Sequence, residues 1–104
     1  MPIPPTPLAV SESLFSFGDH LRTWRKLHGL TGAQTADMAG VSSDTVSRLE
    51  SGKSVGLESA FRIMYSLGIL QNWVETAEPL NTKLGQQRAY EHLPQRVRPK
   101  ASGK

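Results

Sequence analysis

Apolar residues between positions 16 and 78 recur at the spacing of an α-helix, and the alternation typical of strands is absent. The first predicted helix spans about residues 16–28 and ends at Gly29, which suits a left-handed cap. Its apolar face comprises Phe17, Leu21, Trp24, Arg25 and His28. The pattern therefore predicts an all-α fold that opens with an amphipathic helix.

Two short helices are predicted next, and each follows a residue that suits the N-cap position. One begins after Thr31 and ends at Gly40, and its small alanine side chains allow a second helix to approach closely. The other begins after Ser42, carries Asp44 in its positively polarised first turn and ends at Gly52. The chain between residues 31 and 52 is thus expected to form a helix, a tight turn and a second helix.

Two further helices are predicted over about residues 57–67 and 70–77, with Gly68 between them. The apolar face of the earlier one comprises Leu57, Ala60, Phe61, Met64 and Leu67. The later one carries Trp73 and Val74. We interpret the large side chains at helical spacing as core or dimer-interface residues rather than as the lining of a ligand pocket: Trp24, Phe61, Met64 and Trp73.

Five short helices joined by glycine-punctuated links predict one compact domain over residues 16–78. Residues 1–15 are rich in proline and serine and are expected to form a flexible leader. Residues 79–104 are expected to form a basic tail, partly helical near residues 81–90 and otherwise disordered or engaged with a partner. No run approaches the ~20 apolar residues of a membrane span, and the proline-rich start does not resemble a signal peptide, so we expect a cytoplasmic protein.

The net charge of +3 is distributed unevenly along the 104 residues. Residues 1–80 carry six basic and eight acidic side chains, whereas residues 81–104 carry six basic side chains and one acidic one. Such asymmetry is typical of a basic arm that binds an acidic partner, above all nucleic acid. It is equally compatible with a solvated tail that maintains solubility.

The third predicted helix has unusually little apolar surface. Thr45, Val46 and Leu49 share one sector and are expected to face the core. The opposite face holds Ser43, Asp44, Ser47, Arg48 and Ser51. Short polar side chains allow a helix to enter a major groove about 12 Å wide, and an arginine can reach a guanine or a phosphate. This arrangement predicts a helix-turn-helix.

The stretch LRTWRKLHGLTGAQTADMAGVSSDTVSRLESGK, residues 21–53, closely resembles the Cro/C1-type (Xre-like) helix-turn-helix family. The matching features are R-x-x-x-G-L-T at residues 25–31, Ala36, G-V-S at residues 40–42, T-V-S at residues 45–47 and L-E-x-G-K at residues 49–53. The resemblance covers about residues 17–77. It implies a λ-repressor-like fold and sequence-specific binding to double-stranded DNA.

The resemblance also implies roles for individual residues. It places four side chains towards the bases: Ser43, Asp44, Ser47 and Arg48. It assigns phosphate contacts to Ser42, Ser51 and Lys53, and an internal ion pair to Arg25 and Glu50. The family often has glutamine where this chain has Gly32, so Thr31 and Gln34 are the candidates to replace that phosphate contact.

A weaker resemblance concerns residues 68–100, whose short helix and basic end look like those of HipB-type antitoxins. It implies a repressor of its own operon that also binds a HipA-type kinase toxin, with tail contacts from Arg88, Arg96, Arg98 and Lys100. A stand-alone phage-type regulator and a protein-interaction adapter without specific DNA binding remain the alternatives. In each DNA-binding case a homodimer on a palindromic operator is expected.

The sequence does not favour an enzyme. No serine lies in a nucleophile-elbow sequence, and no carboxylate cluster suggests a metal. The run Ser51-Gly52-Lys53-Ser54 lacks the upstream glycine of a phosphate-binding loop. With no cysteine and three scattered histidines, we predict neither a metal site nor a cofactor.

Overall fold

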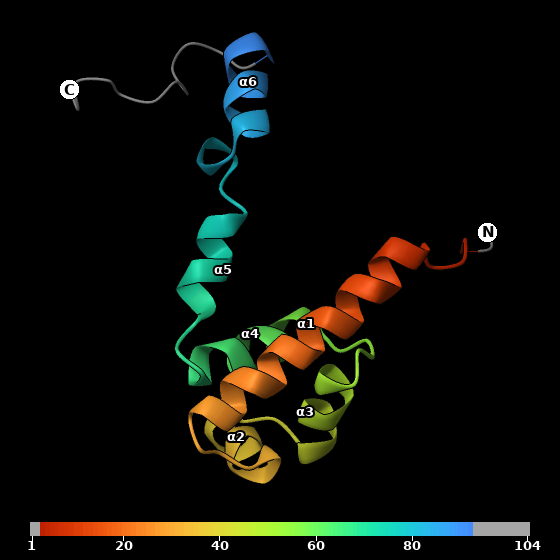
Figure 1. Ribbon diagram of the computed structural model, residues 1–104, viewed down its shortest axis with the longest axis vertical. Helices are drawn as coiled ribbons and strands as arrows, with labels where there is room; N and C mark the ends of the chain where they lie inside the picture. Colours follow the sequence, from red (N-terminus) through yellow and green to blue (C-terminus); the bar gives the residue numbers. More distant parts are fainter. Residues whose placement is uncertain (1–2, 93–104) are drawn as a thin grey trace. The chain divides into compact units, whose positions relative to one another are not determined.

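The computed structural model describes residues 3–92, in which helices are present and strands are not. The elements in chain order are α1 (Leu8–Leu27), α2 (Gly32–Ala39), α3 (Ser43–Glu50), α4 (Leu57–Ser66), α5 (Leu70–Thr76), the 3₁₀ helix η1 (Pro79–Asn81) and α6 (Lys83–His92) (Figure 1). The chain divides into two compact units, one ending at Leu70 and the other beginning at Gln71. The all-α fold class is confirmed.

The first unit is built around α3. Helix α2 packs against both α3 and α4, and α1 lies across α3 (Figure 1). The side chains of the shared core are Leu21, Ala36, Ala39, Val46, Leu49, Ala60, Ile63, Met64, Leu67 and Ile69. Every helix from α1 to α4 contributes to this cluster, so α3 is held from three sides while its remaining surface faces outward.

The ends of α2 and α3 follow from local sequence. Thr31 caps α2, and its hydroxyl accepts the backbone N–H of Gln34 at 3.0 Å. Ser42 caps α3 in the same way and accepts the backbone N–H of Thr45 at 3.1 Å. Between the two helices Gly40 adopts φ 71°, a left-handed conformation that a residue without Cβ reaches at little cost. The helix, turn and helix predicted for this segment are confirmed.

Helix α1 begins earlier than the apolar spacing predicts. Its first residue is Leu8, so residues 8–15 are helical and do not form the flexible leader expected there. The prolines of the leader all precede this point, and Pro7 occupies the N-cap. Proline is tolerated at a helix start because the N–H that it lacks would have no partner in the helix. The prediction extended the influence of these prolines too far along the chain.

The apolar face of α4 was also predicted incorrectly in part. Leu57 is 70% exposed, whereas Ile63, absent from the predicted face, is only 2% exposed. Ile63 lies on the same side of the helix as Ala60 and Leu67, both of which are buried. Leu57 is the first residue of α4 and lies at the margin of that face.

The second unit contains little buried surface. Ala89 is the only buried apolar side chain between residues 71 and 92. Helix α6 packs against η1, and the backbone of Gly85 lies directly against Pro79. Helix α5 contributes no buried residue, and most of it belongs to this unit rather than to the 16–78 domain. The helical segment expected near residues 81–90 is confirmed, and no helix within residues 3–92 could cross a membrane.

Candidate nucleic-acid interface

Helix α3 divides sharply into a buried and an exposed side. Val46 and Leu49 are only 2% and 3% exposed, and Thr45 is partly buried beside them. The side chains predicted to face bases are all on the exposed side: Ser43, Asp44, Ser47 and Arg48. The core therefore anchors α3 through two large side chains, and its outer face consists of short polar groups and one arginine.

The hydroxyl at the start of α3 is already engaged within the protein. Besides capping the helix, the Ser42 hydroxyl shares a 2.9 Å hydrogen bond with the hydroxyl of Thr45. Asp44 lies in the first turn, where the helix dipole favours a carboxylate. Ser42 thus caps the helix through its oxygen, and a phosphate contact from it would use its hydroxyl hydrogen, with Thr45 as the donor in the shared bond.

The Arg48 side chain is turned towards the loop that follows α3. Its Nη2 donates a hydrogen bond of 3.0 Å to the carbonyl of Ser54. The Arg48 guanidinium has five N–H donors and remains exposed, so several N–H groups are available to another acceptor. In this position Arg48 braces the loop and lies at the carboxyl end of the exposed face rather than at its centre.

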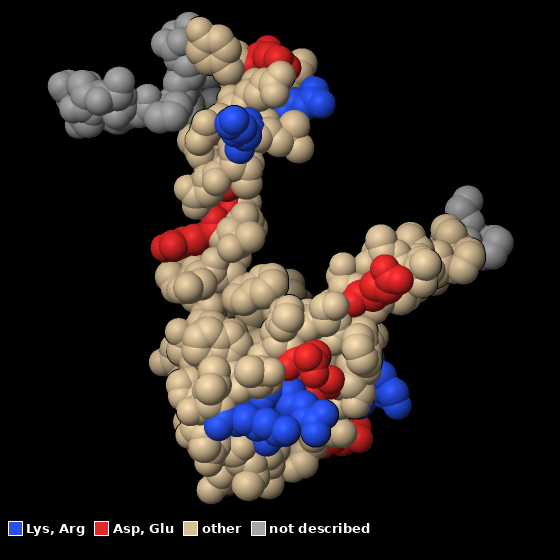
Figure 2. Space-filling model, viewed as in Figure 1, with Lys and Arg blue, Asp and Glu red and all other residues tan. Residues whose placement is uncertain are grey.

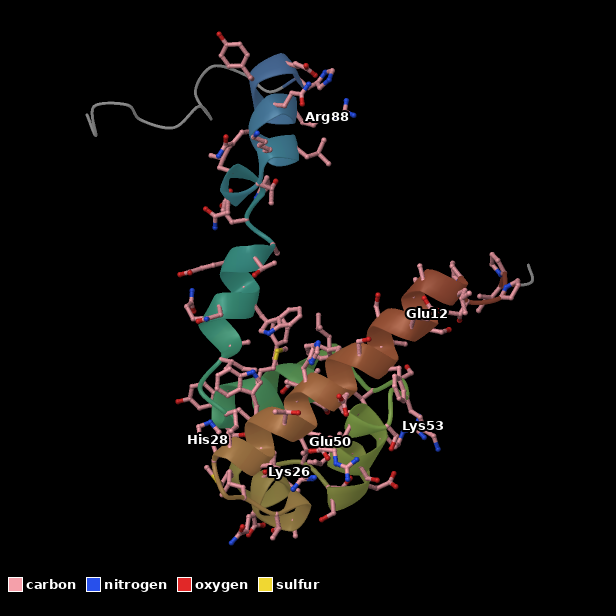
Figure 3. All side chains as sticks on the ribbon, in the orientation of Figure 1. Glu12, Lys26, His28, Glu50, Lys53 and Arg88 are labelled. Atoms are coloured by element: carbon pink, nitrogen blue, oxygen red, sulfur yellow. The ribbon has the colours of Figure 1, made fainter. Side chains whose placement is uncertain are left out.

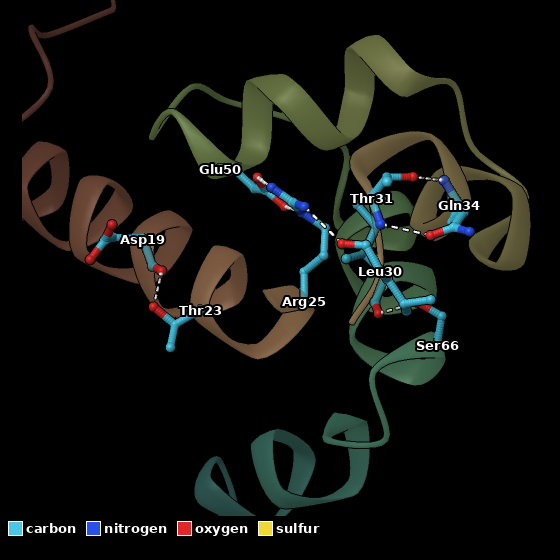
Figure 4. Close-up of polar contacts among 9 residues, drawn as sticks. Asp19, Thr23, Arg25, Leu30, Thr31, Gln34, Glu50 and Ser66 are labelled. Carbon is cyan, nitrogen blue, oxygen red and sulfur yellow. Dashed lines mark hydrogen bonds and ion pairs between the residues drawn. The ribbon is translucent and has the colours of Figure 1, made fainter. Parts of the chain in front are cut away.

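Arg25 and Glu50 form a bidentate ion pair between α1 and the end of α3 (Figure 4). Arg25 Nε lies 2.6 Å from Glu50 Oε2, and Nη2 lies 2.9 Å from Oε1. Nη1 of the same guanidinium donates to the carbonyl of Leu30 at 2.9 Å. The hydrogen bond with Glu50 raises the pKa of Arg25, and the two side chains are only 14% and 13% exposed. One arginine therefore joins α1, the turn before α2 and the last residue of α3.

The start of α2 carries a reciprocal capping box (Figure 4). The side-chain carbonyl of Gln34 accepts the backbone N–H of Thr31 at 2.8 Å, in return for the bond to the Thr31 hydroxyl. Thr31 and Gln34 therefore stabilise a helix start that Gly32 would weaken by itself. No heavy atom of the described chain lies within 4 Å of the place that a Cβ on Gly32 would occupy.

A cleft of about 390 Å³ lies where α1, α2 and α3 meet. Its rim includes Ser43, Ser47 and Ser51 from the α3 side and Gly32 from α2. Arg22 of α1 also lines it, and this exposed arginine has no ion-pair partner among residues 3–92. The cleft thus combines hydroxyl groups with an unpaired guanidinium, which suits an anion.

Arg22 lines this cleft and was not among the residues predicted to contact DNA. The available signal was the group of bases on one helix: Arg22, Arg25 and Lys26. Arg25 is paired with Glu50, whereas Arg22 and Lys26 remain available to contact an anion. Figure 2 shows basic side chains gathered on the face of the first unit where Figure 3 labels Lys26.

The remaining predicted residues do not belong to α3. Lys53 is exposed in the turn after α3 (Figure 3), next to Gly52, whose φ is 81°. Arg88 belongs to α6 in the second unit and lines a small cavity with Glu78, Leu80 and His92. Arg96, Arg98 and Lys100 lie outside the described residues.

The histidines show no metal-binding arrangement. His28 Nε2 is 2.8 Å from the carbonyl of Leu67, and its ring stacks on Trp24 with centroids 6.1 Å apart. In the part of the chain that the structure describes, no three His, Cys, Asp or Glu side chains are grouped as a metal ion would require. His28 thereby links the ends of α1 and α4.

Residues 16–64 match the family model of a helix-turn-helix domain. This range begins inside α1, includes α2 and α3 and ends in α4. Neither the curated proteins nor the solved structures that were compared gave a match. The chain thus combines an all-helical fold with a helix-turn-helix domain, which points to a DNA-binding regulator.

Proposed function

We propose that the protein is a sequence-specific transcriptional repressor of the Cro/C1 type and that α3 is its recognition helix. The observation that carries the proposal is the exposed polar face of α3, within a stretch that matches a helix-turn-helix domain. Two large buried side chains fix the orientation of α3, and the ion pair from Arg25 fixes its end. A helix held in this way is already ordered before binding, so little further conformational entropy is lost when it enters the major groove.

In the proposed complex the base edges are read by short side chains. Ser43 and Ser47 donate to or accept from either base of a pair, and Asp44 accepts from the exocyclic amine of cytosine. A carboxylate at this place also repels phosphates, so Asp44 narrows specificity at a cost in affinity. Arg48 reaches a guanine or a phosphate after exchanging its contact with Ser54.

The DNA backbone is held by groups on both sides of α3. Lys53 and Ser51 follow the helix, and Arg22 approaches from α1 across the cleft. The NH₂ group of Gln34 completes the contact at the start of α2, because only the carbonyl of that amide is used by the capping box. Each phosphate neutralised by Lys or Arg steepens the slope of the logarithm of the binding constant against the logarithm of the salt concentration by about 0.9.

One domain of this size contacts few bases, so the proposed repressor acts as a homodimer on a palindrome with half-sites about 34–36 Å apart. The resemblance of residues 68–100 to HipB-type antitoxins supports a finer proposal. In that case the dimer represses its own operon and binds a HipA-type kinase toxin, and Arg88, Arg96, Arg98 and Lys100 contact DNA or the toxin.

A protein-interaction adapter is the second candidate. Three observations favour it: Gly32 offers no side chain at the start of α2, Asp44 repels phosphates, and Arg48 is bonded to Ser54. An adapter would keep the packed first unit and lack a preferred DNA sequence.

Selection of bound fragments from random duplex DNA, at about 50 mM and 200 mM salt, separates the candidates. The repressor proposal predicts a palindrome that is enriched at both salt concentrations. An Arg48→Ala variant should then lose about 1–3 kcal/mol at one base position and tolerate other bases there. Enrichment that disappears at the higher salt, with no shared sequence, would favour the adapter.

A further inference from the structure

Helix α1 is longer than its packing in the first unit requires. Its 20 residues include only two buried ones, Gly18 and Leu21. At Phe15 the backbone of α1 lies against Gly52 in the turn after α3. Residues 8–15, called the overhang below, extend for about 12 Å on the amino-terminal side of Ser16. The part before the contact at Phe15 projects from the rest of the first unit (Figure 1).

The overhang is apolar over half of its circumference. Val10 and Leu14 extend the stripe of Phe17 and Leu21 that enters the core. Leu8 and Phe15 lie seven residues apart on the adjoining face, and they are 72% and 65% exposed. Ser11 lies between these two sets. An apolar surface of this extent on a helix is typical of an interaction site.

Charge identifies the kind of partner. Glu12 is the only ionisable side chain between residues 3 and 18, and no lysine or arginine occurs before Arg22. The segment therefore offers nothing to DNA phosphates or to anionic lipid headgroups. It suits an apolar surface that is itself nearly uncharged, and the overhang of a second copy is such a surface.

We infer that the overhang is the homodimer interface, formed by two copies of α1 packed antiparallel about a two-fold axis between Ser11 and Glu12. In this pairing Leu8 of one copy meets Phe15 of the other, and Ser11 meets Glu12. A small serine at the centre lets the helices approach closely. The inference rests on the homodimer of the proposed function but not on DNA binding.

The size of the patch predicts how strong this dimer is. Burial of the exposed apolar side chains would hide on the order of 400 Å² on each copy, about half of what a standard interface buries per partner. We therefore expect a reversible dimer with a micromolar dissociation constant. The axis lies about 5 Å along the helix from Phe15, so the Gly52 turns that follow α3 would lie on either side of it.

Cysteine cross-linking tests the geometry, because the chain has no cysteine of its own. Ser11→Cys places a thiol at the centre of the apolar face, and Ser13→Cys places one on the opposite side of the same helix. Both serines are exposed, so both variants should fold. Under mild oxidation Ser11→Cys should give at least about fivefold more disulfide-linked dimer than Ser13→Cys. Equal yields, or a higher yield from Ser13→Cys, would overturn the inference.

Sedimentation velocity over about 1–200 µM separates this inference from the proposed homodimer. The wild-type chain should dimerise, whereas the Leu8→Glu and Phe15→Glu variants should sediment as monomers at every concentration. The control variant Tyr65→Glu changes a 75% exposed side chain of α4 and should dimerise like the wild type. Circular dichroism should show equal helicity in all four. A wild-type dimer that survives Leu8→Glu would refute the overhang as interface while the homodimer stands. A wild-type monomer throughout would refute both, with the DNA proposal still decided by fragment selection.

Discussion

The two units of the chain obtain their helices in different ways. The first buries ten apolar side chains in one cluster, whereas between residues 71 and 92 only Ala89 is buried among apolar side chains. The helices of the second unit depend on local hydrogen bonds. The backbone N–H of Leu80 donates to the Glu78 carboxylate, and that of Gly85 donates to the Thr82 hydroxyl. A shared core makes the first unit a rigid support for α3, and its absence leaves the second unit with exposed apolar side chains.

Truncation of one leucine in each unit should give the largest contrast. Leu49→Ala leaves a cavity in the core and should lower the free energy of unfolding by about 2–5 kcal/mol. Leu84→Ala, at a 62% exposed position in α6, should change it by less than about 0.5 kcal/mol. Urea unfolding followed by circular dichroism measures both. Similar losses would show that the second unit carries a core after all.

The next contrast lies between two ion pairs of the first unit. Glu50→Gln strands the largely buried Arg25 and should cost about 3 kcal/mol. Glu58→Gln removes the exposed partner of Arg62 and should cost less than about 0.5 kcal/mol. The pair with Glu50 raises the pKa of Arg25, so its stabilisation is complete below the ordinary arginine pKa and is lost only as the pH rises through the raised value. The effect of Glu50→Gln should accordingly stay constant between about pH 6 and pH 9.

Two glycines compare tight backbone contacts in the two units. A Cβ on Gly18 would overlap the carbonyl oxygen of Leu49, and one on Gly85 would overlap that of Pro79. Gly18→Ala should therefore destabilise the main unfolding transition by about 1–3 kcal/mol, because α1 must move away from α3. Gly85→Ala should reduce helicity and leave that transition unchanged. Thermal unfolding with a helicity measurement distinguishes the two, and a shared loss of stability would contradict the division into units.

The smallest expected effect concerns DNA. Arg22→Gln should make the salt dependence of binding shallower by about one logarithmic unit, because one phosphate contact is lost. Arg88→Gln, in the second unit, should change the slope less. Fluorescence anisotropy with the selected operator over a range of salt gives both slopes. If Arg88→Gln has the larger effect, the second unit and not the α1 cleft supplies the backbone contact.

Much of the helix-turn-helix could be predicted because its determinants are local. Thr31 and Ser42 cap helices through N–H groups three residues away, and left-handed turns occur at Gly29, Gly40, Gly52 and Gly68. The polar face of α3 is likewise visible in the spacing of its residues. One prediction failed at a helix end, because Leu57 satisfies the apolar period but lies at the margin of the core. Ile63, in the middle of α4, was missing from the predicted face although it is buried.

The sequence by itself determined the all-α class, the caps of α2 and α3, the glycine turns and the candidate base-facing residues, since each depends on groups within about four positions. Only the tertiary structure decided that Gly18 lies against the end of α3, that Arg22 faces a cleft with three serines, and that Arg48 bonds to Ser54. It also showed that α1 starts at Leu8 and extends past its own core. Such features depend on the distance and angle at which separate helices pack, and the periodicity of residues within one helix does not determine either of them.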